Sequence, residues 1–98
     1  MQKMIAGVMT AQIHMQGITS LKQKRSIVKS LIGRLKSRFN ISIAEVDHQD
    51  CKGSAVVGIS VVSNDSRFIN QQFDKIIDFM QADGRFYLGQ IERETFNS

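Results

Sequence analysis

The densest group of side chains that could do chemistry lies near the middle of the chain. Glu45, Asp47, His48, Asp50 and Cys51 place carboxylates, an imidazole and a thiol within seven residues. Such groups can act as acids and bases or as metal ligands, but a metal site needs three or four ligands that converge. Successive side chains of a strand point to opposite faces, so we expect Glu45 and Asp47 on one face and His48 on the other. We therefore expect hydrogen bonds at a hairpin end, with no catalytic, cofactor-binding or metal-binding residue.

The remaining reactive side chains are not expected to complete a site. We expect His14 and His48 at opposite ends of one sheet, which disfavours a two-histidine site unless two subunits share it. Cys51 is the lone cysteine, so an internal disulfide is excluded, and no glycine-rich nucleotide-binding motif is present. The sequence predicts a non-enzymatic protein without a cofactor, located in the reducing cytoplasm.

A set of positive side chains is the strongest functional signal. Residues 20–40 carry seven Lys or Arg residues and no Asp or Glu. Like charges at helical spacing repel one another, and positive charges in a first helical turn oppose the helix dipole. A bound anion would relieve both costs, so we interpret the set as candidates for binding phosphate groups. Its members are Lys22, Lys24, Arg25, Lys29, Arg34, Lys36 and Arg38.

The alternative is a helix face that is solvated or neutralised within the molecule. Lysine stems can cover apolar surface while their ammonium groups stay in water. Asp74, Asp78 and Asp83 on a neighbouring helix could also pair with the basic residues. The sequence leaves both interpretations open.

Composition limits the organisation of the chain. Its 98 residues, 42% of them hydrophobic, suit a single domain over 1–98. Because no long apolar run and no signal-peptide pattern occurs, we expect neither membrane association nor export. Residues 1–44 carry eight basic and no acidic residues, whereas residues 45–98 carry five basic and nine acidic ones. This asymmetry favours an anionic partner or association between complementary faces.

Hydrophobic periodicity predicts four strands and two amphipathic helices. Ser20 and Gln23 form a capping-box pattern at the start of the first helix, and Asn40 is a candidate left-handed C-cap. We expect strands over 4–15, 41–47, 54–63 and 86–93, and helices over 20–40 and about 65–84.

The element order β-α-β-β-α-β is typical of the ferredoxin-like split-βαβ fold in the α+β class. It predicts a four-stranded antiparallel sheet of order 4-1-3-2 with both helices on one face. We further expect strands one and three to be parallel, with both helix N-termini at one end of the sheet. The hairpin between strands two and three is then expected at the opposite end.

The sheet face that the helices leave open is a candidate interface. We expect Val8, Val56 and Val62 there, while the register of strand 41–47, which would decide whether Ile43 joins them, stays open. A partly apolar open face would suit a homodimer, and a monomer with a mildly apolar surface is the alternative.

Three segments together indicate a family. They are Ser20-Leu21-Lys22-Gln23-Lys24-Arg25, Ala44-Glu45-Val46-Asp47-His48-Gln49-Asp50 and Val62-Ser63-Asn64-Asp65. Over nearly the whole chain, the sequence resembles the YlxP-like bacterial proteins, a domain of unknown function. The resemblance implies a ferredoxin-like fold, no known reaction, and genes that often lie among those of translation factors and beside that of ribosome-binding factor A.

Signatures of sequence-specific RNA recognition are absent, since the chain has no Gly-x-x-Gly clamp and no aromatic pair in its central strands. Our first hypothesis is a non-enzymatic protein that holds the phosphates of structured RNA or of a ribosomal particle through the basic helix. The second is a homo-oligomeric interaction or regulatory module whose basic helix is merely solvated. A third, hydrolytic or metal-dependent chemistry at Glu45, Asp47 and His48, has the least support.

Overall fold

Alternating burial along the strands builds the sheet. In the computed structural model, which describes residues 3–98, the strands are β1 (Ile5–His14), β2 (Ser42–Asp47), β3 (Ser54–Ser63) and β4 (Tyr87–Asn97). Odd-numbered residues are buried throughout β1, and also in β3 up to residue 61, because they face the helices. Even-numbered residues of both strands are partly or fully exposed on the other face.

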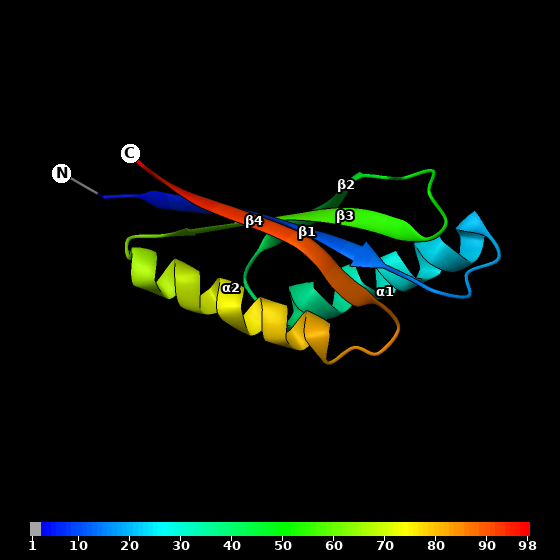
Figure 1. The fold of residues 1–98 in the computed structure, drawn as a ribbon. Helices are drawn as coiled ribbons and strands as arrows, with labels where there is room; N and C mark the ends of the chain where they lie inside the picture. The colour runs from blue at the N-terminus through cyan, green and yellow to red at the C-terminus, as the bar shows by residue number, and fades with distance from the viewer. Residues whose placement is uncertain (1–2) are drawn as a thin grey trace.

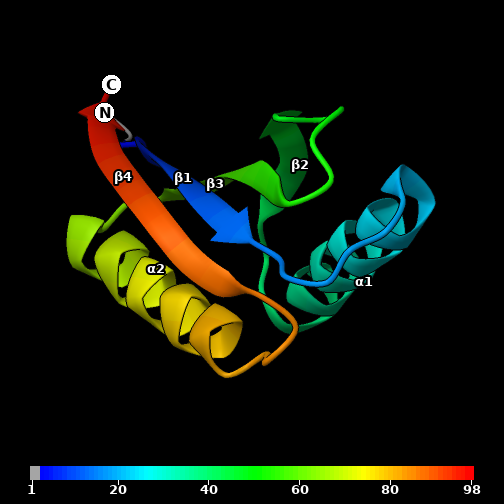
Figure 2. The same ribbon diagram turned by 45° about the vertical axis from the view of Figure 1, so that its right-hand side comes forward.

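The strand order is β2-β3-β1-β4, and every neighbouring pair is antiparallel. Figures 1 and 2 show both helices covering one face of this sheet, with the two termini at the same end. The predicted ferredoxin-like α+β fold, with its sheet order 4-1-3-2, is confirmed.

The predicted direction of the third strand is wrong. Ile5 pairs with Ser63 and His14 with Ser54, so β1 and β3 are antiparallel. The parallel strands are β1 and β2, which the first helix connects and between which β3 is inserted. That helix therefore begins at the same end of the sheet as the β2–β3 hairpin, not at the opposite end.

The first helix, α1 (Leu21–Arg38), begins at the predicted cap. The Ser20 hydroxyl accepts a hydrogen bond from the Gln23 backbone N–H at 3.1 Å. The Gln23 side chain accepts from the Thr19 N–H instead of completing the box at Ser20. At the other end Phe39 is the C-cap in an extended conformation, so the left-handed cap predicted at Asn40 is not formed.

The second helix, α2 (Ser66–Gln81), is capped by Asp65, whose carboxylate accepts from the Arg67 N–H at 2.9 Å. Its buried side chains recur at helical spacing and fill the space against β1 and β3. They are Ile69, Phe73, Ile76 and Met80. Neither helix in the described part of the chain is long and apolar enough to cross a membrane.

The last strand, β4, continues beyond its predicted end at Arg93 to Asn97. The extension carries few apolar residues, because this edge strand is exposed along most of its length, and periodicity therefore gives no signal there. Its residues 94–97 pair with β1, and a register shift between Ala11 and Ile13 marks a bulge near residues 89–90.

The packing of α2 on β1 leaves no room for a side chain at Gly7. A Cβ atom there would overlap Cγ2 of the fully buried Ile69 and lie 3.1 Å from the Phe73 ring. We expect Gly7→Ala to lower the free energy of unfolding by about 1–3 kcal/mol through overpacking, measured by urea denaturation. The control is Gly33→Ala at an exposed helical position with open space around it. It should be stabilising by up to about 1 kcal/mol, and effects of the same sign at both positions would contradict the packing argument.

Candidate functional site

Four of the predicted phosphate-binding residues share one exposed line along α1. At 100° per residue, Lys22, Arg25, Lys29 and Lys36 fall within about 60° of the helix circumference, over a length of about 21 Å. All four are exposed, and within residues 3–98 none of them forms an ion pair. We call these four residues the basic stripe.

The prediction that Lys24 binds phosphate is wrong, because its side chain is buried inside the protein. Its side chain is 0% exposed, and its ammonium group donates to Glu45 Oε2 at 2.6 Å, to the His48 carbonyl at 2.8 Å and to the Gln49 carbonyl at 3.2 Å. An ammonium group has three donors, so all of them are satisfied inside the protein. Lys24 ties the first turns of α1 to the β2–β3 hairpin and has no atom available for a phosphate.

The sequence does contain a signal for this burial. Lys24 precedes Val28 by four residues and Leu31 by seven, which places it on the apolar side of the helix. Its partner Glu45 could not be identified, because the predicted strand directions put the hairpin at the far end of the sheet. The antiparallel β3 brings the hairpin beside the start of α1.

The register of β2 divides the acidic residues differently from the prediction. Glu45 pairs with Val57 on the helix side, whereas Asp47 pairs with Val56 on the open side, since a bulge at Val46 shifts the alternation. Ile43 is buried under the helices at 8% exposure, so it does not belong to the open face.

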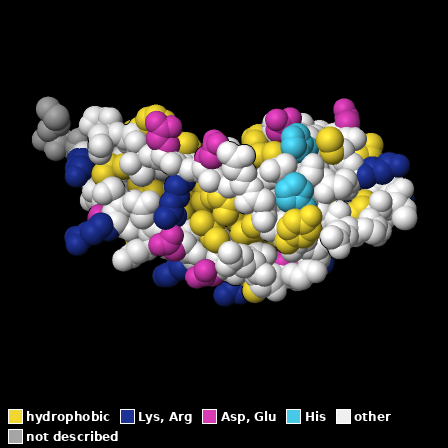
Figure 3. Space-filling model, in the orientation of Figure 1, with side chains coloured by type: hydrophobic (Ala, Val, Ile, Leu, Met, Phe, Trp, Pro, Cys, Tyr) yellow, Lys and Arg dark blue, Asp and Glu magenta, His cyan; other side chains and the backbone are white. Residues whose placement is uncertain are grey.

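The predicted separation of the two histidines is also wrong. His14 pairs with Ser54 across β1 and β3, and His48 Nδ1 lies 2.9 Å from the Ser54 hydroxyl. Both histidines therefore lie at one end of the sheet, and Figure 3 shows their side chains close together. The His14 ring also stacks on the Tyr87 ring. Within residues 3–98 no three His, Cys, Asp or Glu side chains are placed to hold a metal ion.

Two other predicted residues, Arg34 and Arg38, lie beside α2 rather than in the stripe. Their guanidinium groups stand over the Phe79 ring at 5.1 and 5.0 Å from its centroid. Arg34 also donates to Asp83 Oδ2 at 3.1 Å. The alternative that acidic residues neutralise the basic helix therefore holds for Arg34, which pairs with Asp83. It does not hold for Asp74, which pairs with Arg93 of β4 instead.

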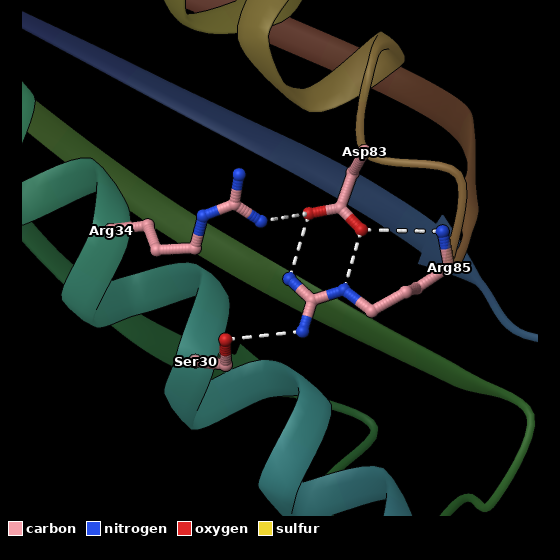
Figure 4. A network of polar contacts seen from close by, with 4 residues as sticks. All are labelled: Ser30, Arg34, Asp83 and Arg85. Atoms are coloured by element: carbon pink, nitrogen blue, oxygen red, sulfur yellow. Dashed lines mark hydrogen bonds and ion pairs between the residues drawn. The ribbon is translucent and has the colours of Figure 1, made fainter.

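Asp83 is one of the acidic residues expected as possible partners of the basic helix, but sequence reasoning missed Arg85 and Ser30, which complete a network joining α1 to the α2–β4 connection (Figure 4). The Asp83 side chain is 1% exposed and accepts from Arg85 Nε at 2.6 Å and from a terminal Arg85 nitrogen at 2.7 Å. Arg85 also donates to the Ser30 hydroxyl at 3.0 Å. One carboxylate therefore holds two guanidinium groups from different elements.

Charge and hydrogen bonding shift the ionisation of this network. Hydrogen bonds from the Arg85 side chain hold the pKa of Asp83 below its usual value of 3.8, against the opposing effect of burial. The Arg85 backbone N–H and the charges of Arg85 and Arg34 lower this pKa further. In return, the bound carboxylate raises the pKa of Arg85.

Comparison with known proteins places the chain in a family. The family described as "Protein of unknown function (DUF503)" matches residues 6–93. The chain belongs to this family. The matched range of the DUF503 family contains the basic stripe, Lys24 and Asp83, and the resemblance to YlxP-like proteins is confirmed.

This DUF503 chain is similar in sequence to a known protein and similar in fold to a solved structure. It is 30% identical over 63 residues to the "Uncharacterized protein YlxP" of Bacillus subtilis (strain 168), covering 64% of this chain and 68% of that protein. The solved structure of "De novo designed protein Foldit4" superposes with a TM-score of 0.54 over 99% of both chains at 12% identity. At that identity the likeness shows the fold alone.

Proposed function

We propose that this protein is a non-enzymatic, ribosome-associated binding protein that holds structured RNA through the basic stripe of α1. The observation that carries the proposal is the stripe itself, with four exposed cations on one line and no acidic partner within residues 3–98. Like charges at spacings of three and four residues destabilise an isolated helix, and bound phosphates would remove that cost.

The shape of the stripe supports a polymer as the ligand. Its lysines are seven residues apart, about 10 Å along the helix, and none of its four members lines any of five well-formed hollows of the described residues. A small phosphorylated molecule needs a concave site, whereas a nucleic-acid backbone can lie along an open helix. RNA is the preferred polymer because the resemblance implies genes that often lie among those of translation factors.

The test is the binding of a fluorescent RNA hairpin, measured by anisotropy between about 50 and 200 mM salt. If four phosphates are contacted, the logarithm of the binding constant should fall with the logarithm of salt at a slope of about −3 to −4. The variant with Lys22, Lys29 and Lys36 all changed to Gln should reduce the slope to about −1, because each lost contact removes about 0.7–0.9.

A matched variant separates the stripe from net charge. Changing Lys3, Lys52 and Lys75 to Gln removes the same charge from exposed positions outside α1 and should leave the slope near that of the unmodified protein. An equal reduction of the salt slope in the two triple variants, or no RNA binding at low salt, would contradict the proposal. Circular dichroism should show that both variants keep the fold, since exposed substitutions usually change stability by less than about 0.5 kcal/mol.

A further inference from the structure

Three adjoining hollows form a shallow groove across the open face of the sheet. Its largest part, about 410 Å³, is lined by residues of β1, β2 and β3, and two neighbouring hollows share Thr10 with it. Gly58 pairs with Thr10 and Ala44, and the Val46 side chain lies over it, since a Cβ atom on Gly58 would be 2.9 Å from Val46 Cγ1. We call the three hollows together the open-face groove.

One wall of the groove is apolar and the other is acidic. Val8 of the inner strand β1 and Val46 of the edge strand β2 are 39% and 51% exposed. Glu92 and Glu94 of β4 lie opposite Thr10 and Val8 in the register and line the hollow beside them. Figure 3 shows Asp and Glu side chains on the sheet side of the molecule, at the top of the view, with hydrophobic atoms between them.

Among residues 3–98, Arg93 is the one Lys or Arg residue that lines the groove, between the two glutamates in the sequence, and its guanidinium group pairs with Asp74 of α2 at 2.9 Å. The paired residues that face the open side of β1, β2, β3 and β4 include no Lys or Arg in the described chain. The molecule therefore presents a basic stripe on α1 and an acidic, partly apolar groove on the opposite face.

The charge pattern selects among occupants of the groove. A second copy stacked face to face would bring the four carboxylates of two Glu92–Glu94 pairs into one interface with no unpaired cation, which is unfavourable. A cationic segment with apolar anchors would fill the hollow at Val8 and Val46 and neutralise the glutamates. A helix about 10 Å across fits over four strands spaced about 4.8 Å apart.

We propose that the open-face groove binds a Lys/Arg-rich amphipathic helix of a partner protein. The apolar side of the helix packs against Val8 and Val46, and its basic side chains reach Glu92 and Glu94. This is the helix-in-groove mode of recognition, with charge complementarity fixing which helix is accepted. The surface is separate from the basic stripe, so this binding does not depend on the RNA-binding proposal.

The test uses the full chain labelled with ¹⁵N and a synthetic amphipathic helix of about 14 Leu and Lys residues. We expect saturable shifts at the amides of Val8, Thr10, Ala44 and Gly58, and little change along α1. Two control peptides replace every Lys by Glu or every Leu by Ser, and neither should bind at concentrations that saturate the first. Equal binding of either control, shifts confined to the helices, or no saturation at millimolar peptide would overturn the proposal.

A pair of double variants tests the role of the glutamates. Glu92→Gln with Glu94→Gln should weaken binding of the Leu/Lys peptide about 3- to 10-fold, as expected for two partly exposed ion pairs. Asp50→Asn with Asp78→Asn removes the same charge from exposed positions outside the groove and should leave affinity unchanged. An equal loss of peptide affinity in the two double variants would overturn the proposal. A concentration-dependent dimer with shifts at the groove amides would also overturn it, because a second copy would then be the occupant.

Discussion

Lys24→Met is expected to lower the free energy of unfolding by about 3–5 kcal/mol, measured by urea denaturation. The substitution keeps most of the buried chain length but removes the ammonium group that binds Glu45 and two hairpin carbonyls. Glu45, whose side chain is 17% exposed, would then be an unpaired carboxylate largely cut off from water. The carbonyls of His48 and Gln49 would lose a donor at the same time.

Two further variants make this prediction specific. Lys29→Met changes an exposed lysine of the same helix and should alter the free energy of unfolding by less than about 0.5 kcal/mol. Glu45→Gln, made alone and together with Lys24→Met, completes a double-mutant cycle. We expect the two losses to be non-additive by about 0.5–3 kcal/mol, because both remove the same ion pair. A loss below about 1 kcal/mol for Lys24→Met would show that the buried ammonium is not needed for the fold.

The second large effect is expected at Asp83, where Asp83→Asn should lower the free energy of unfolding by about 1.5–3 kcal/mol at pH 7. The amide keeps the shape of the carboxylate but loses the charge that holds Arg85 and Arg34. The effect should be smaller than at Lys24, because the two guanidinium groups are 35% and 53% exposed and water can solvate them. Asp74→Asn breaks an exposed ion pair with Arg93 and should cost less than about 1 kcal/mol.

The pKa of Asp83 gives this effect a defined pH dependence. Because the pKa of Asp83 is lowered in the folded protein, the carboxylate stabilises the fold fully above its ordinary value of 3.8. This contribution is lost as the pH falls through the lower folded pKa. The difference between the unmodified protein and Asp83→Asn should therefore be constant near neutral pH and shrink below about pH 4. A difference that grows with acidity would contradict the assigned ion pairs.

The sequence was sufficient for features that depend on near neighbours. Alternation of apolar residues in β1 and β3, helical spacing in α2 and the cap at Ser20 each reflect contacts within a few residues, so the element order followed from them. Once the order β-α-β-β-α-β was known, few compact sheet topologies remained, and the predicted 4-1-3-2 order was the one adopted. The exposed line of Lys22, Lys29 and Lys36 also followed from helical periodicity alone.

The structure decided the strand directions and the side-chain contacts that join distant parts of the chain. Helical spacing places Lys24 on the apolar side of α1, but only the hairpin that returns 21 residues later supplies its partner, Glu45. The face of Ile43 depends on the register between β2 and β3, and the bulge at Val46 then reverses the parity of Asp47, so neither side chain could be placed from β2 alone. The acidic groove exists because β4 lies beside β1 and turns Glu92 and Glu94 to the open face. These arrangements depend on strand direction and register, which are set by packing of the whole core rather than by local sequence.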